Sequence, residues 1–199
     1  MAVKKKKIVD KWKTKKWYDL VSPEMFGGKV VGEIISSDEK SLLNRIVIVN
    51  LAELETEGEV NRRMLSSIRV NLRVIDVKGK GANTKYIGHS IQPSYLRTLA
   101  RRGRTVIDLV SDEKTKDEKE MRIKLVAVAE GSISHLVRKN LRREMKTALG
   151  EIVKEMDFEK CISESLHGKI TGKLYNRLKQ ITDMAKVEIK KLEVKENFE

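Results

Sequence analysis

The stretch MRIKLVAVAEGSISHLVRKNLRREMKTALGEIVKEM, residues 121–156, decides the fold class because its hydrophobic period changes at Gly131. Residues 121–129 are mostly aliphatic, which is typical of a buried strand. After Ser132, which is placed to cap a helix, the apolar residues follow the period of an amphipathic α-helix. A strand followed by a helix that must bury one face indicates an α+β fold. The apolar stripe consists of Ile133, Leu136, Val137, Leu141, Ala148, Leu149, Ile152, Val153 and Met156.

Short strands dominate the chain before this stretch. Residues 68–74 alternate cleanly between apolar and polar side chains, and a turn at 79–83 would lead into a return strand. Six or so strands at short spacing favour an antiparallel β-barrel-like or sandwich core over a parallel sheet. The expected strands are 29–36, 45–51, 68–74, 85–91, 105–111 and 121–129.

The C-terminal third adds packed helices and one more strand. Apolar spacing predicts helices over 158–166 and 170–181, and alternation predicts a last strand over 186–194. We therefore expect a basic extension over residues 1–24 and a single globular domain over 25–199. Within that domain, 25–130 is mainly β, 131–184 is mainly helical and 185–194 is the final strand.

Positive charge is concentrated at the N-terminus. The 199 residues carry 42 Lys+Arg and 29 Asp+Glu, a net charge of +13, of which residues 1–18 supply +7. A solubilising or cloning-derived tail would explain the lysines alone. The aromatic residues Trp12, Trp17 and Tyr18 argue against a purely solvating tail, because flat rings can stack on bases or dock on the tail's own domain. Lysines interleaved with such rings favour an RNA-binding arm. The lysines are Lys4, Lys5, Lys6, Lys7, Lys11, Lys13, Lys15 and Lys16.

Two further basic clusters lie within the expected domain. One follows Ser94, a candidate helix cap, and the other repeats at helical i, i+4 spacing. Either cluster alone is equally well explained as a solvated helix face, but three clusters together favour a polyanionic partner. The two clusters are Arg97, Arg101, Arg102 and Arg104, and Arg138, Lys139, Arg142, Arg143 and Lys146.

Candidate catalytic and metal-binding residues are sparse. The three histidines, His89, His135 and His167, are scattered, and the single cysteine, Cys161, falls at an apolar helical position. No nucleotide-binding, zinc-binding or hydrolase motif is present, so we expect neither enzymatic activity nor a cofactor. The longest apolar run is residues 125–129, too short to span a membrane, and no secretory signal begins the chain. The cytoplasm is therefore the expected location.

The segment KKWYDLVSPEMF, residues 15–26, resembles the start of archaeal and eukaryotic small-subunit ribosomal proteins of the S3Ae family, also called eukaryotic-type S1. The likeness continues through RVIDVKGK at 73–80, YIGHS at 86–90 and YLR at 95–97 with the arginines that follow. It also includes the basic helix around 138–145. The resemblance therefore extends over nearly the whole chain.

The resemblance implies a non-enzymatic constituent of the small ribosomal subunit, on its platform near the messenger exit. It implies a β-barrel-like core with packed helices and an N-terminal arm that enters RNA. The implied partners are ribosomal RNA, neighbouring platform proteins and messenger RNA near the exit, with no membrane contact. The chain ends soon after the last expected strand, without the basic C-terminal extension of eukaryotic members, which favours an archaeal source.

Residue chemistry alone leaves other functions open. The net charge fits a DNA-packaging or chromatin protein equally well. An RNA-processing enzyme acting through His89 or His135, and an adaptor that binds only proteins, are further alternatives.

Overall fold

A long hairpin lies at the centre of the computed structural model, which describes residues 12–54 and 65–196. Its strands are β4 (Ile68–Lys78) and β5 (Gly81–Ile91), joined by a tight turn in which Gly79 adopts a φ of +62°. The alternation expected from the sequence buries Ile68, Val70, Leu72 and Val74 on one face of β4.

The N-terminal half of the molecule is built around the first part of this hairpin. β1 (Lys16–Val21) runs parallel to the start of β5 and antiparallel to β2 (Val30–Ser36). β3 (Ile46–Asn50) pairs with β4, and α1 (Leu51–Leu54) follows it directly. Two short 3₁₀ helices, η1 (Glu24–Phe26) and η2 (Glu39–Ser41), complete this half.

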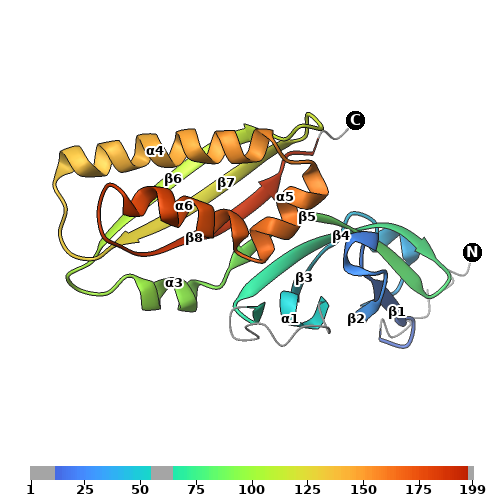
Figure 1. Cartoon of the computed structure of the whole chain (residues 1–199). Coiled ribbons are helices and arrows are strands. Elements are labelled where there is room, and N and C mark those ends of the chain that lie inside the picture. Colours follow the sequence, from blue (N-terminus) through green and yellow to red (C-terminus); the bar gives the residue numbers. More distant parts are fainter. Residues whose placement is uncertain (1–11, 55–64, 197–199) are drawn as a thin grey trace, which may run out of the picture.

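The C-terminal half begins where β5 changes partners. Gly88–Ser90 of β5 pair with β8 (Met184–Val194), which is followed across the sheet by β7 (Glu120–Ala129) and β6 (Thr105–Lys114). The helices α4 (His135–Lys154), α5 (Phe158–Leu166) and α6 (Lys169–Lys179) pack on one face of these strands (Figure 1). α3 (Pro93–Leu99) lies against the opposite face, along Val106, Val126 and Val128.

The expected barrel or sandwich is corrected to one open, branched sheet of eight strands in a mixed α+β fold. Within the described residues, β2, β3 and β6 each pair on one side only, so the sheet does not close. The physical reason is the length of β5, which is long enough to pair with β1 at one end and with β8 at the other. Helices rather than a second sheet then cover the apolar face of β6–β8.

The expected extension over 1–24 is also too long, because Lys16–Val21 form a strand of the sheet. Tyr18 and Leu20 are buried in the core, with 3% and 2% of their surfaces exposed. The lysines that precede Trp17 concealed this strand, since they suggest a solvated tail. The division of the chain into an extension and a single domain stays a prediction, with its boundary moved to about residue 15.

Both expected helix caps are shifted by two residues. Ser134 rather than Ser132 caps α4, its Oγ accepting a hydrogen bond from the Val137 amide at 3.4 Å. Gln92 rather than Ser94 occupies the N-cap position of α3, and Pro93 begins that helix. In the described part of the chain, no helix is long and apolar enough to cross a membrane.

Candidate nucleic-acid interface

The second basic cluster lies on α3 and on the turn that joins it to β6. Arg97 is in the last turn of α3, and Arg101, Arg102 and Arg104 follow the helix end. All four side chains are exposed. Gly103 has a φ of +80°, a conformation that favours glycine and turns the chain back into the sheet.

The third cluster lies along the first half of α4. The face of α4 toward the sheet buries Leu141, Met145 and Leu149, which turns the basic residues outward. Lys139, Arg142, Arg143 and Lys146 are exposed, whereas Arg138 is half-buried.

The structure brings these two clusters together at one end of the C-terminal half. The β6–β7 hairpin pairs Thr105 with Ala129, which places the start of β6 beside the connection that leads into α4. Thr105 Oγ1 donates a hydrogen bond to the Gly131 carbonyl at 2.8 Å and fastens the two segments together. A hollow of about 400 Å³ lies between them, lined by Gly103, Arg104, Thr105, Val106, Ser132 and Arg138.

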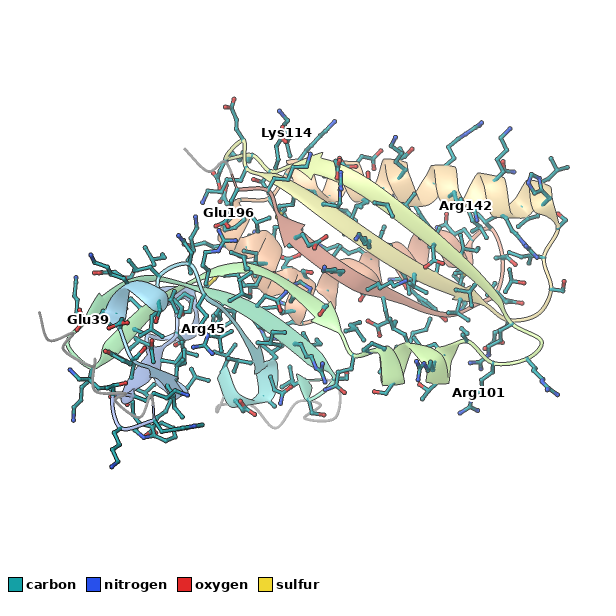
Figure 2. All side chains as sticks on the ribbon, turned by 180° about the vertical axis from the view of Figure 1, so that it is seen from behind. Glu39, Arg45, Arg101, Lys114, Arg142 and Glu196 are labelled. Carbon is teal, nitrogen blue, oxygen red and sulfur yellow. The ribbon has the colours of Figure 1, made fainter. Side chains whose placement is uncertain are left out.

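The labelled side chains in Figure 2 show the same arrangement. Arg101 and Arg142 lie at one end of the β6–β8 sheet, and Lys114 and Glu196 lie at the other. We call the nine cations of the two clusters the arginine end: Arg97, Arg101, Arg102, Arg104, Arg138, Lys139, Arg142, Arg143 and Lys146.

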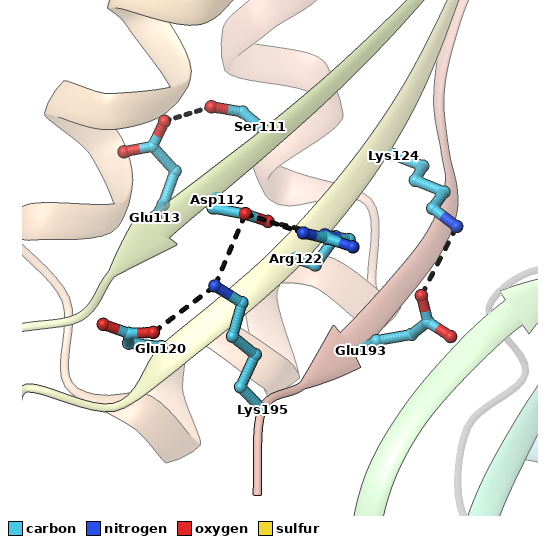
Figure 3. Close-up of polar contacts among 8 residues, drawn as sticks. All are labelled: Ser111, Asp112, Glu113, Glu120, Arg122, Lys124, Glu193 and Lys195. Atoms are coloured by element: carbon cyan, nitrogen blue, oxygen red, sulfur yellow. Dashed lines mark hydrogen bonds and ion pairs between the residues drawn. The ribbon is translucent and has the colours of Figure 1, made fainter.

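The opposite end of this sheet carries both charge signs, and there they pair. Arg122 donates two hydrogen bonds to Asp112, at 2.7 Å from Nε and 2.9 Å from Nη2, and Lys195 Nζ lies 3.4 Å from both Asp112 and Glu120 (Figure 3). The hydrogen bond from Arg122 holds the pKa of the Asp112 carboxyl well below its usual value. Lys114 pairs with Glu120 at 2.8 Å, which lowers the pKa of that carboxyl.

The arginine end lacks such compensation. Among residues 12–54 and 65–196, none of its nine cations forms an ion pair with a carboxylate. Adjacent like charges repel each other unless an anion lies between them. This end of the molecule therefore carries uncompensated positive charge, whereas at the opposite end cations and carboxylates pair.

The N-terminal basic residues lie elsewhere. Figure 1 places β1 in the half of the molecule away from α3 and the start of α4, so the structure does not join this cluster to the arginine end. Trp12 and Trp17 are 69% and 60% exposed, and Lys15 Nζ lies 3.6 Å from the centroid of the Trp12 ring. Lys13 and Lys16 are exposed too, whereas Lys4, Lys5, Lys6, Lys7 and Lys11 lie outside the described residues.

Tyr18 does not belong to this surface. Its neighbour Trp17 points to solvent, and because successive residues of a strand face opposite sides, Tyr18 points into the core. The expectation that the Tyr18 ring stacks on a base is therefore wrong.

Of the candidate catalytic residues, His89 and Cys161 are buried and His135 is at the surface. His89 is buried between Tyr86 and Ser165, and its burial lowers the pKa to about 4. Cys161 is buried in the core, which raises the pKa of its thiol to about 11. His135 is exposed in the first turn of α4. In the described part of the chain, no group of His, Cys, Asp and Glu side chains could hold a metal ion.

Sequence reasoning identified both clusters of the arginine end but missed that they adjoin. The signal was available, because the expected strands at 105–111 and 121–129 form a hairpin whose open end brings residues 104 and 130 together. The residues just before the first strand must then lie close to the residues just after the second strand.

Comparison with known proteins agrees with the resemblance seen in the sequence. The family model described as "Ribosomal S3Ae family" matches residues 3–197. The chain belongs to the ribosomal S3Ae family. Membership in this family confirms the expectation of a ribosomal protein and not an enzyme.

Three curated relatives are similar to this S3Ae family chain over nearly its whole length. A protein of Methanobrevibacter smithii is 31% identical over 97% of each chain, and one of Methanothermobacter thermautotrophicus is 30% identical over 97% of this chain and 96% of its own. A third, from Methanococcus vannielii, is 31% identical over 94% of this chain and 83% of its own. All three are named "Small ribosomal subunit protein eS1".

Proposed function

We propose that this chain is a structural constituent of the cytoplasmic small ribosomal subunit, where it binds ribosomal RNA on the platform near the messenger exit. The relatives' names and the resemblance support the subunit and the location. The single observation that supports the RNA contact is the arginine end, in which nine cations gather without carboxylate partners among the described residues.

Two separate basic surfaces would let one protein hold two segments of RNA. The arginine end lies in the C-terminal half, and β1, which begins at Lys16, lies in the other half. Strand β5, which pairs with β1 at one end and with β8 at the other, connects the two halves and would set the distance between the RNA segments that they bind. The protein would thereby set the relative positions of RNA helices during assembly, beside neighbouring platform proteins and messenger RNA.

The two surfaces would bind by different chemistry. At the arginine end, affinity comes mainly from release of counterions, and each phosphate contact contributes about 0.7 to 0.9 to the salt slope. The exposed rings of Trp12 and Trp17 would add stacking, at roughly 1 to 3 kcal/mol for each base.

A pair of charge-matched variants tests the role of the arginine end. Arg142→Gln with Arg143→Gln removes two cations that have no carboxylate partner in the described residues. Lys114→Gln with Lys116→Gln removes two exposed cations that are paired with Glu120 and Asp157. Binding to small-subunit ribosomal RNA is measured for each variant by filter binding over a range of salt concentrations.

We expect the arginine variant to bind more weakly and to lose about 0.7 to 0.9 of salt slope for each phosphate contact removed. The lysine variant should keep both values close to those of the unchanged protein. Equal loss in both would show that only net charge matters and would contradict a defined RNA surface at the arginine end. Duplex DNA added as competitor should displace little of the RNA. A chromatin protein would instead prefer the duplex and release the RNA.

A further inference from the structure

The hollow at the arginine end is lined by two arginines and, among the described residues, by no acidic residue. Arg104 comes from the turn before β6 and Arg138 from the first turns of α4, and the other lining residues are small or uncharged. A cavity with positive lining and no internal counter-charge is suited to an anion.

Hydrogen bonds connect the two segments that line the hollow. Thr105 is buried, and its bond to the Gly131 carbonyl ties the Arg104 side of the hollow to the α4 side. Ser134 caps α4, and the Arg138 amide donates to the Ser134 carbonyl at 3.1 Å. Arg138 therefore enters the hollow from a capped helix whose N-terminus carries the positive end of the helix dipole.

Arg138 has a donor that the protein leaves unused. Its Nε is shielded from solvent and has no hydrogen-bond partner among the described residues. Buried donors without acceptors are rare in folded proteins, so an acceptor oxygen that reaches this atom would be favoured. Gly103 adds room, since a Cβ built at this glycine would meet nothing within 4 Å.

We propose that this hollow binds a single phosphate group of the RNA backbone, held by the guanidinium forks of Arg104 and Arg138. The assignment of RNA as the source of the phosphate rests on the proposed function. Both planar forks present paired N–H donors, which match the oxygens of a phosphate better than a lysine does.

The surroundings favour a phosphate chain over the carboxylate of an acidic peptide. Exposed cations continue from the hollow in two directions, through Arg101 and Arg102 on the turn and through Arg142 and Arg143 on α4. A nucleic-acid backbone carries one negative charge per nucleotide and can follow such a line, whereas an isolated acidic side chain fills only the hollow.

NMR of the Arg Nε–H groups in the full chain, labelled with ¹⁵N-arginine, tests the site directly. Inorganic phosphate is the first probe and a single-stranded RNA oligonucleotide is the second. The third is an acidic peptide with the same net charge as the oligonucleotide. We expect the Arg104 and Arg138 signals to shift together with one dissociation constant, at lower phosphate concentration than the signals of Arg142 and Arg143. Equal shifts at all four arginines, or tighter binding of the peptide than of RNA, would overturn the site.

Lysine replacements separate the geometry of the fork from its charge. Arg138→Lys keeps the charge but removes Nε, and should abolish the saturable phosphate response at Arg104 and weaken RNA binding about tenfold. Arg177→Lys is the matched control, because Arg177 of α6 lies outside the arginine end and pairs with Glu151 at 2.7 Å, and it should change neither. Arg104→Lys, on an exposed turn where the fold is not at risk, should likewise abolish the saturable phosphate response at Arg138 and weaken RNA binding.

The outcomes distinguish this site from the proposed function. If phosphate does not bind in the hollow while Arg142→Gln with Arg143→Gln still weakens RNA binding, the site is wrong and the proposed function stands. If phosphate binds as expected but ribosomal RNA does not bind the protein, the site stands and the proposed function falls.

Discussion

At the scale of single residues, His89 is the clearest case of a polar group used for structure. It is 2% exposed, with Nδ1 at 2.6 Å from the Tyr86 hydroxyl and Nε2 at 3.3 Å from the Ser165 hydroxyl. A neutral imidazole has one donor and one acceptor, so it can satisfy both contacts at once. His89 thereby links β5 to α5 across the interior.

The buried His89 predicts a loss of stability in mildly acidic solution. Burial lowers its pKa from 6.5 to about 4, so between these values the unfolded chain binds more protons than the folded one. The free energy of unfolding should therefore fall as the pH drops from about 6.5 to 4, by up to about 3 kcal/mol. Urea unfolding at several pH values measures this fall.

Two histidine variants isolate the effect from other groups. His89→Gln should flatten the stability profile between pH 6.5 and 4, whereas His135→Gln, at an exposed histidine, should leave it unchanged. Carboxylates with lowered pKa, such as Asp112, lose their stabilising charge only at lower pH. A profile that stays equally steep in His89→Gln would show that His89 is not the titrating group.

At the scale of elements, β1 determines where the N-terminal extension ends. Deletion of residues 1–15 removes Trp12 and seven lysines but leaves β1 whole, so the fold should remain and RNA affinity and salt slope should fall. Deletion of residues 1–21 also removes Tyr18 and Leu20 from the core, at about 1.5 to 3 kcal/mol for each side chain. Urea unfolding and RNA filter binding of both truncations measure the two effects.

The outcome of these truncations separates an RNA-binding arm from a structural segment. If deletion of residues 1–15 unfolds the chain, these residues contribute to the fold and are not a separate arm. If it leaves RNA binding unchanged, the lysines and Trp12 form a solubilising tail.

Most elements could be predicted because their patterns are local. The strands at 30–36, 46–50 and 68–78 and all three C-terminal helices begin and end within a few residues of the expected positions. β1 was missed because the run of lysines before Trp17 suggests a solvated tail. This outweighed the strand-like alternation of the inward residues Tyr18 and Leu20 with Trp17 and Asp19. Its pairing with the start of β5 is a long-range contact that no local pattern encodes.

The open sheet was missed for a related reason. Short strands at regular spacing are equally compatible with a barrel, a sandwich or one branched sheet. The choice depends on β5, whose first residues pair with β1 and whose residues 88–90 pair with β8, at the far end of the chain.

At the scale of the whole molecule, net charge says less than its distribution. The charge of +13 combines a lysine-rich N-terminal segment, the arginine end of the C-terminal half and a region where Arg122 and Lys195 pair with carboxylates. Charge and composition predicted a polyanionic partner, and the pairing of β6 with β7 brings two of the basic clusters onto one surface.

The two halves meet through a narrow junction, which determines whether they unfold as one unit. β5 and β8 pair at only Gly88, His89 and Ser90, and a Cβ at Gly88 would clash with the Leu192 carbonyl oxygen. Gly88→Ala should therefore push β8 away from β5 and destabilise the chain by about 1 to 3 kcal/mol. Gly32→Ala is the matched control, because a Cβ at this strand glycine would meet nothing within 4 Å.

Native-state hydrogen exchange can test the single domain and its junction together. In the unchanged protein and in Gly32→Ala, the slowest amides of β4 and of β7 should report the same opening free energy, since one cooperative unit opens as a whole. In Gly88→Ala the two values should separate, because the junction no longer couples the halves. Different values in the unchanged protein would mean that the chain after residue 15 holds two domains. Equal values in Gly88→Ala would mean that coupling runs through other contacts, such as those of His89 with α5.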